Sequence, residues 1–157
     1  MRKVSAGLLL FRRGPSGLEF LLVHPGGPFF RDKDAGAWSL PKGEVGPGED
    51  PLAAARREFE EETGVAPAGP FLPLSPITQK GGKVVHAWAV EGDLDPDAVR
   101  SNPVRLEWPP RSGRFVEFPE VDRAAFFPPD EAARRINPAQ AALLRQLEAM
   151  LGPRDPS

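Results

Sequence analysis

Cysteine is absent from the 157 residues of this chain. The absence excludes disulfide bonds, thiol nucleophiles and thiolate metal ligands. It is also typical of proteins kept in a reducing cytosol, so we expect a cytoplasmic location. Long apolar segments are missing as well, because no run approaches the roughly 20 residues that a membrane-spanning helix needs. We therefore expect no membrane partner.

A strong charge of either sign is the next feature that the chain lacks. Its 20 Lys and Arg and 22 Asp and Glu residues leave a formal net charge of −2, with a pI near 5.8. This balance argues against bulk electrostatic binding to nucleic acid, and we expect no stable nucleic-acid partner. Arg2-Lys3 precedes the apolar run Val4–Phe11, but Arg12-Arg13 closes that run and no small-residue cleavage site follows. A buried first strand is therefore favoured over a signal peptide.

The length of the chain is that of one domain. We expect a single domain over residues 1–152 and a disordered tail at 153–157. The 20 prolines and 16 glycines are spread along the chain, where they mark turns between elements, and do not form a low-complexity tract. A monomer and a homodimer are both compatible with this pattern.

The hydrophobic pattern predicts strands that alternate with helices. One helix is predicted from Asp50-Pro51 to Gly64, because Asp is a favoured N-cap, Pro fits the first helical position and Gly often follows the last turn. Strands are predicted at Val4–Phe11, Phe20–His24, Phe71–Gln79, Val84–Val90, Leu106–Trp108 and Arg123–Phe127, and further helices at Pro129–Arg135 and Pro138–Leu151. Pro25–Lys42 is expected to be a long loop. These elements predict an α/β fold in which helices cover both faces of a mixed sheet.

The most informative segment is residues 43 to 65, GEVGPGEDPLAAARREFEEETGV. It fits the frame G-x5-E-x7-R-E-U-x-E-E-x-G-U, in which U is apolar, at every fixed position. Seven fixed residues, each at roughly 5–7% abundance, make a chance match on the order of 10⁻⁸ per starting position. The fixed residues are Gly43, Glu49, Arg57, Glu58, Glu61, Glu62 and Gly64, with Phe59 and Val65 at the apolar positions.

Three glutamates of this segment gather on one side of the predicted helix. At about 100° per residue, Glu58, Glu61 and Glu62 fall within an arc of about 100°. Like charges on one helical face repel one another, so helix stability alone does not select them. A hard divalent cation such as Mg²⁺ takes oxygen ligands and removes the repulsion. The alternative is a solvated acidic face, and this is our interpretation of Glu60, which points away from the other three.

The frame is the signature of the Nudix hydrolases, and the chain resembles that family over residues 3 to 151. The resemblance implies the Nudix α/β/α sandwich, a mixed sheet flanked by helices, and hydrolysis of a nucleoside diphosphate linked to another group. Trp38–Gly43 is similar to the W-x-x-P-K-G motif at the start of the signature in diadenosine and diphosphoinositol polyphosphate hydrolases. The whole pattern resembles a bacterial branch described as predicted NTP pyrophosphohydrolases.

The resemblance also implies a metal site. In Nudix enzymes the helix glutamates bind Mg²⁺ or Mn²⁺, and Glu58, Glu61 and Glu62 match them. The first glycine of the signature commonly supplies a carbonyl oxygen, which in this chain is that of Gly43. In diadenosine polyphosphate hydrolases a glutamate shortly before the aromatic residue of a later strand joins the site, and Glu120 precedes Phe126 by six residues. A solvated loop carboxylate is the alternative for Glu120.

Catalytic and positioning roles follow from the same resemblance. Glu49 and Arg57 match residues that hold the carboxylates in place through salt bridges. The general base is left open between Glu120 and a glutamate of the helix. The residues expected to carry catalysis are Glu58, Glu61, Glu120 and Arg57.

Basic residues around this segment are expected to bind the phosphates of the substrate. They are Lys42, Lys80, Lys83, His86 and Arg111. Several cations that converge on one cleft would suit an extended polyphosphate chain. Ordinary surface charge is the alternative for the Lys and Arg residues, and a place in the core is the alternative for His86.

The predicted function is divalent-metal-dependent hydrolysis of a phosphoanhydride bond in nucleoside polyphosphates. Dinucleoside polyphosphates such as diadenosine tetraphosphate are the first expectation. Removal of (d)NTPs and oxidised nucleotides is the runner-up, and trimming of RNA 5′ ends and cleavage of sugar nucleotides stay open. From a different class, a Nudix fold also serves as a nucleotide sensor without cleavage, although such modules tend to lose glutamates that are all intact in this chain.

Overall fold

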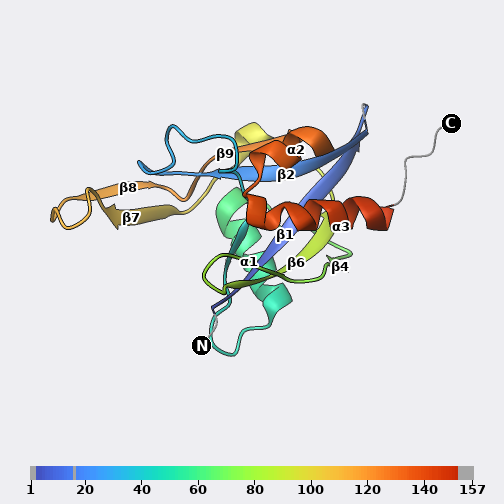
Figure 1. Ribbon diagram of the computed structural model, residues 1–157, viewed down its shortest axis with the longest axis horizontal. Helices are drawn as coiled ribbons and strands as arrows, with labels where there is room; N and C mark the ends of the chain where they lie inside the picture. Colours follow the sequence, from blue (N-terminus) through green and yellow to red (C-terminus); the bar gives the residue numbers. More distant parts are fainter. Residues whose placement is uncertain (1–2, 16, 152–157) are drawn as a thin grey trace.

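A computed structural model describes residues 3–15 and 17–151 of the chain (Figure 1). The larger sheet contains β1 (Val4–Gly14), β2 (Gly17–Pro25), β3 (Lys42–Glu44), β4 (Leu72–Pro73), β5 (Ile77–Thr78), β6 (Val84–Glu91) and β9 (Val121–Phe127). A separate ribbon contains β7 (Pro103–Glu107) and β8 (Phe115–Pro119). The α-helices are α1 (Pro51–Thr63), α2 (Pro129–Arg135) and α3 (Ala141–Leu151), and the 3₁₀ turns are η1 (Pro96–Ala98) and η2 (Pro138–Gln140).

β1 organises the larger sheet. It pairs in parallel with β6 and antiparallel with both β2 and β3, so the sheet is mixed, as predicted. β9 extends the sheet beyond β2, whereas β4 and β5 pair with the outer side of β6. The pairing places Gly43 of β3 opposite Ala6 of β1, beside the start of the central strand.

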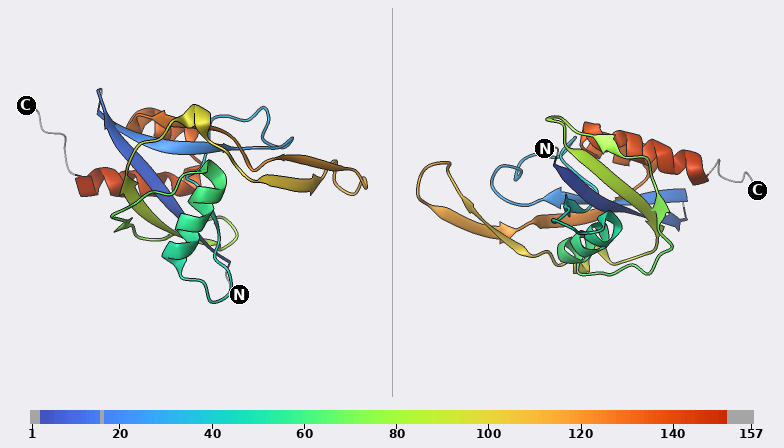
Figure 2. Two further views of the ribbon diagram at one scale, coloured as in Figure 1. Left: turned by 180° about the vertical axis from the view of Figure 1, so that it is seen from behind. Right: turned by 90° about the horizontal axis from the view of Figure 1, so that it is seen from below.

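Both faces of β1 are buried, because successive side chains of a strand point to opposite faces. Leu8 and Leu10 belong to a core on the face covered by α1, together with Phe59 of that helix. Leu9 and Phe11 belong to a second core with the side chains of α3. Figure 2 shows α1 and α3 on opposite sides of the sheet. The predicted α/β sandwich is therefore confirmed.

The termini of α1 are those predicted. The side chain of Asp50 accepts a hydrogen bond from the backbone N–H of Ala53 at 3.0 Å, and Pro51 occupies the first turn. Gly64 ends the helix with φ of 81°, a left-handed conformation that glycine adopts without a Cβ penalty, and its N–H donates to the carbonyl of Glu60.

The strand predicted at Phe71–Gln79 is confirmed only in part, because it is interrupted in the middle. Only β4 and β5 pair with β6 in this region, and residues 74–76 between them are not in a strand. Pro73 and Pro76 have no amide hydrogen, so they cannot continue a ladder on both sides. The periodic apolar pattern was real, but the prolines confine the pairing to two short segments.

The strand predicted at Leu106–Trp108 was misplaced, and β8 was not predicted. β7 ends at Glu107, and its register places Leu106 opposite Val116 of β8. Pro103 begins β7 and Pro119 ends β8, and both strands are short, which weakens the sequence signal for strands. The ribbon extends away from the body of the molecule (Figure 1).

Two smaller differences concern the site and the end of the chain. Lys42–Glu44 lies in a strand, β3, rather than at the end of a loop. The last helix is α-helical only from Ala141, because Pro138–Gln140 forms a 3₁₀ turn capped by the side chain of Asn137. The tail predicted at 153–157 lies outside the described residues.

Across the described parts of the chain, none of the helices combines the length and the hydropathy needed to cross a bilayer.

Phe59 is fully buried where α1 meets the sheet. We expect Phe59→Ala to lower the free energy of unfolding by about 3–5 kcal/mol, because it removes a buried ring and leaves a cavity. Glu60→Ala, on the exposed side of the same helix, is the matched control and should stay within about 0.5 kcal/mol of the wild type. Urea unfolding followed by circular dichroism measures both, and equal effects would show that this helix does not depend on its apolar face.

Candidate active site

Glu58 lies flush against the backbone of Gly43. Pairing with β1 holds β3 in place, and α1 packs beside it. A Cβ atom built on Gly43 would lie 2.0 Å from Cδ of Glu58 and within 2.3 Å of both of its oxygens. Any other residue at position 43 would displace this carboxylate. The requirement for glycine at this position is therefore steric, and it arises from the contact between β3 and α1.

Three carboxylates meet at this place. Glu58, Glu62 and Glu120 each offer an oxygen atom, and these atoms all lie within 4.8 Å of one another. Glu62 is 4% exposed, and its Oε2 atom is buried without a hydrogen-bond partner. Like charges this close and this little hydrated are unfavourable unless a proton or a cation compensates them.

The position of Glu120 is set by backbone hydrogen bonds that lead back to α1. The N–H of Glu120 donates to the carbonyl of Asn102 at 3.0 Å, and the N–H of Asn102 donates to the carbonyl of Glu61 at 3.0 Å. The carbonyl of Glu120 accepts from the N–H of Gly26 at 2.9 Å. The residue between β8 and β9 is thus tied both to the last turn of α1 and to the loop after β2.

The electrostatics of the three carboxylates reflect their burial. Burial, followed by the neighbouring charges of Glu120 and Glu58, raises the pKa of Glu62 to about 9. Burial is also the main cause of the raised pKa of Glu58 and of the raised pKa of Glu120. An unpartnered buried oxygen within a set of hard oxygen donors fits a divalent cation such as Mg²⁺ or Mn²⁺.

Arg57 forms the hydrogen bonds that hold the Glu58 carboxylate in place. Its Nε and Nη2 atoms donate to the two oxygens of Glu49 at 2.8 and 3.0 Å, a bidentate pair. Its Nη1 atom donates to Glu58 at 2.9 Å, and its Nη2 atom also reaches the carbonyl of Glu44 at 3.2 Å. The hydrogen bond with Arg57 lowers the pKa of Glu49 to about 2. The guanidinium therefore holds the Glu58 carboxylate while Glu49 holds the guanidinium.

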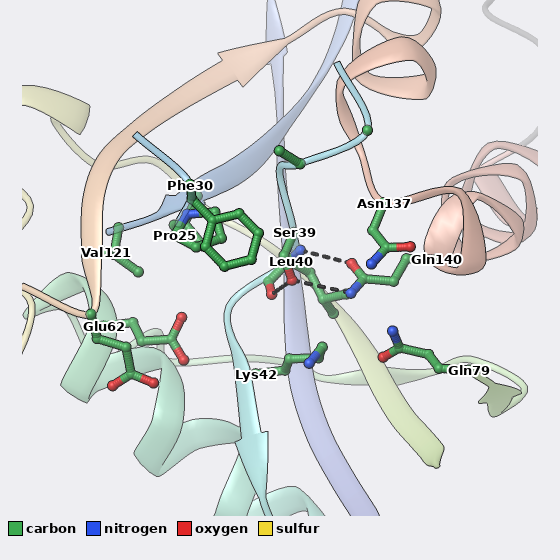
Figure 3. A pocket seen from close by; sticks show the side chains of 14 residues that line it. Pro25, Phe30, Ser39, Leu40, Lys42, Glu62, Gln79, Val121, Asn137 and Gln140 are labelled. Carbon is green, nitrogen blue, oxygen red and sulfur yellow. Dashed lines mark hydrogen bonds between the residues drawn. The ribbon is translucent and has the colours of Figure 1, made fainter. Parts of the chain in front are cut away.

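A pocket of about 250 Å³ opens beside the carboxylates. Figure 3 shows Lys42 and Glu62 among the side chains that line it. Glu120 lines it as well, and Lys42 is the one cation among the described lining residues. Burial, followed by the charge of Lys83, lowers the pKa of Lys42, while the surrounding glutamates act in the opposite direction. A partly buried lysine and two carboxylates thus line the same space.

Amide side chains form the other side of this pocket, and they were not among the predicted site residues. Gln140 is buried; its Oε1 accepts from the N–H of Leu40, and its Nε2 donates to Oγ of Ser39, each at 3.2 Å (Figure 3). Gln79 and Asn137 line the same pocket. Isolated amides far apart in the sequence carry no local signal, and only Asn137 before Pro138 matched a pattern, that of a helix start.

The other residues predicted to bind phosphate differ in how close they lie to the pocket and the carboxylates. Lys83 is close enough to Lys42 to affect its pKa. Lys80 is exposed in the turn before β6, and His86 lies on β6 opposite Ala6 of β1; neither lines the pocket. Arg111 lies in the turn that joins β7 to β8, at the far end of the ribbon (Figure 1). The structure therefore brings Lys42 to the carboxylates and keeps Arg111 away from them.

The comparison with known families decides the identity of this fold. Residues 1–147 match the sequence profile of the NUDIX domain. The chain belongs to the Nudix family.

Relatives of this Nudix protein include proteins named as a pyrophosphohydrolase and as a tetraphosphatase. An RNA pyrophosphohydrolase of Roseobacter denitrificans is 60% identical over 37 residues, which cover 24% of this chain and 23% of that protein. The bis(5'-nucleosyl)-tetraphosphatase (asymmetrical) of Rattus norvegicus is 32% identical over 99 residues, 55% of this chain and 63% of that protein. Among solved structures, the Ap4A hydrolase of C. elegans in a binary complex has a TM-score of 0.65 at 23% identity, with 94% of this chain and 97% of that chain covered.

These matches differ in what they establish. The alignments with the bacterial and the rat relatives span less than two thirds of those proteins, and about a quarter of the bacterial one. The structural match at 23% identity shows that the fold is shared.

Glu61 stands apart from the other carboxylates of the Nudix helix. Its carboxylate lies 3.3 Å from Nη1 of Arg57 and is 36% exposed. It does not belong to the group formed by Glu58, Glu62 and Glu120 among the described residues. Its charge nevertheless raises the pKa of Glu120, so the two side chains are close enough to interact.

We expect Gly43→Ala to weaken binding of Mg²⁺ by at least about tenfold, because the added methyl group displaces the Glu58 carboxylate. The rise in melting temperature with increasing Mg²⁺ measures this affinity. Gly92→Ala is the matched control, since its Cβ would lie 3.2 Å from only the flexible end of Leu10. Equal Mg²⁺ affinities in the two variants would show that the contact between Gly43 and Glu58 does not shape the site.

Proposed function

We propose that this Nudix protein is a divalent-metal-dependent pyrophosphohydrolase of nucleoside polyphosphates. The observation that carries the proposal is the meeting of Glu58, Glu62 and Glu120 next to Lys42, at a pocket. Carboxylates in this arrangement would hold Mg²⁺ or Mn²⁺, and the ammonium group would bind a phosphate of the same substrate. The names of the two hydrolase relatives support the same reaction class.

The cation would supply the Lewis-acid charge that polarises phosphoryl oxygens and lowers the pKa of the attacking water. The residues that would hold it are Glu58, Glu62 and Glu120, with the carbonyl of Gly43 as a further ligand. Arg57 keeps the Glu58 carboxylate in a single orientation through the 2.9 Å hydrogen bond. Positioning of this kind contributes to catalysis because the charges are oriented before the reaction begins.

Proton transfer is assigned to Glu120. It stands on a segment separate from the helix, on the wall of the pocket that Lys42 also lines. A carboxylate has two oxygen atoms, so Glu120 could hold the cation through one oxygen and accept the proton of the attacking water at the other. Glu61, more exposed and bound to Arg57, is the alternative base.

Dinucleoside polyphosphates are the substrate class that we propose. The relative in Rattus norvegicus is named for cleavage of bis(5'-nucleosyl) tetraphosphates, and its alignment with this chain is longer than that of the bacterial RNA pyrophosphohydrolase. An extended polyphosphate would also use both the carboxylate group and Lys42, which lie on the same pocket.

We expect Glu62→Gln to lower kcat/KM by at least about 10²-fold, because it removes a charge from the preorganised group. Circular dichroism should show an intact fold. Glu60→Gln, an exposed neutralisation on the same helix, should leave turnover unchanged. Nucleotide binding with no turnover in the wild type or in either variant would instead identify a sensor.

Turnover of several substrates with Mg²⁺ tests the substrate class. We expect kcat/KM for diadenosine tetraphosphate to exceed that for dATP, 8-oxo-dGTP, ADP-ribose and a diphosphoinositol phosphate at least about tenfold, or roughly 1.4 kcal/mol in transition-state binding. ATP and AMP should be the products, identified by chromatography. A preference for dATP or 8-oxo-dGTP would assign the protein to the removal of mononucleotides.

A further inference from the structure

A second pocket lies between the loop after β2 and the β7–β8 ribbon. Its volume is about 310 Å³, at the lower end of the range for small-molecule sites. Its lining includes Pro28, Arg31, Trp108, Val116, Phe118 and Asp122. None of these residues lines the pocket beside the carboxylates.

The two pockets share a wall. The loop after β2 lies directly on the junction of β8 and β9, because the N–H of Gly26 donates to the carbonyl of Glu120 and a Cβ on Gly27 would lie 2.7 Å from the ring of Phe118. Along this junction Phe118 and Asp122 line the second pocket, whereas Glu120, between them, lines the first. A ligand that contacts Phe118 or Asp122 in the second pocket is therefore two residues along the chain from Glu120, and consecutive Cα atoms are about 3.8 Å apart. Figure 1 shows the same loop beside the base of the ribbon.

The walls of the second pocket suit a flat aromatic ligand. Val116 and Phe118 stand on one face of the ribbon, opposite Leu106 and Val104 of β7, and Trp108 follows the end of β7. Val116, Phe118 and Trp108 are all partly buried, so they form a wall rather than a loose surface. Indole and phenyl rings bind nucleobases by stacking, which accepts any base with an open π-face.

Carboxylates at the same pocket add a preference among bases. Asp122 lines it, and so does Glu117. The Asp122 carboxylate is held by the buried ring of His24, whose Nδ1 lies 2.8 Å from its Oδ1 atom, while Nε2 of His24 lies 2.6 Å from the carbonyl oxygen of Lys33. A fixed carboxylate accepts hydrogen bonds from an exocyclic amino group, which adenine has and uracil lacks.

We propose that this second pocket binds an amino-bearing nucleobase of the substrate, with adenine as the fitting case, while the polyphosphate runs past Glu120 into the first pocket. The base stacks on Trp108, its amino group faces Asp122, and Arg31 offers a positive charge on the loop side. This assignment rests on the proposed function for its substrate class. The binding of the base itself requires no turnover, so the two are separable by experiment.

The first test is a titration of ¹⁵N-labelled protein with adenosine and, separately, with uridine, in the absence of phosphate and metal. The indole N–H signal of Trp108 is identified by its loss in Trp108→Ala. We expect adenosine to shift this signal more than those of Trp38 and Trp88, and uridine to shift it less. A shift that is absent, or equal for all three indoles, would overturn the proposal.

The second test is kinetic and uses diadenosine tetraphosphate with Mg²⁺. Trp108→Ala should raise KM on the order of tenfold, as expected for loss of one stacked base, with little change in kcat. Phe115→Ala is the matched control, because Phe115 is a 51% exposed aromatic residue of β8, next to Val116 but on the opposite face of the strand, and it does not line the pocket. Equal KM values in the two variants would refute base stacking on Trp108. Val116→Trp, which fills the pocket, replaces Trp108→Ala if that variant does not fold.

The outcomes separate the base pocket from the catalytic assignment. Adenosine binding at Trp108 in a protein that turns over no nucleotide would support the pocket and refute the proposed function. Normal turnover with a Trp108 signal that does not respond to adenosine would refute the pocket and leave the function standing.

Discussion

Repulsion among buried carboxylates is the constraint on which the rest of this structure depends. Glu58, Glu62 and Glu120 bring oxygens within 4.8 Å of one another, and burial, followed by the charges of Glu120 and Glu58, raises the pKa of Glu62 to about 9. Such a group persists only if the surrounding fold holds each member firmly, and if a cation or protons compensate the charge.

The fold meets this requirement from two directions. On the α1 side, Phe59 anchors the helix in the core while Gly43 lets the Glu58 carboxylate lie against β3. On the other side, backbone hydrogen bonds through Asn102 tie Glu120 to the last turn of the same helix. The carboxylates are therefore positioned by main-chain pairing and core packing, which are more rigid than side-chain contacts at the surface. Arg57 and Glu49 then restrict the orientation of Glu58.

The base of the β7–β8 ribbon helps to hold Glu120 in place. A two-stranded ribbon is marginally stable by itself, and this one is anchored at its base where Gly26 and Gly27 allow close approach to Phe118 and Glu120. The anchor that fixes Glu120 also creates the pocket next to it. Glu120, one of the three carboxylates, and the aromatic wall proposed to bind a base thus belong to one continuous segment of the chain.

What the sequence by itself determined was local and periodic. The spacing from Gly43 to Gly64 predicted α1 with both of its ends and the carboxylate side of that helix, because capping and a 3.6-residue repeat act within a few residues. The short apolar runs at Val4–Phe11 and Phe20–His24 likewise predicted the strands at the centre of the sheet. Prolines confined the pairing at 71–79, where the pattern alone predicted a longer strand.

Only the tertiary structure decided which distant residues meet: Glu120 with Glu58 and Glu62, Gln140 with Leu40, and Asp122 with His24. It also kept Arg111 away from the carboxylates, because the direction of the ribbon depends on contacts at its base and not on its own residues. The physical reason is that side-chain proximity across the chain follows from strand pairing and packing, which no short segment encodes alone.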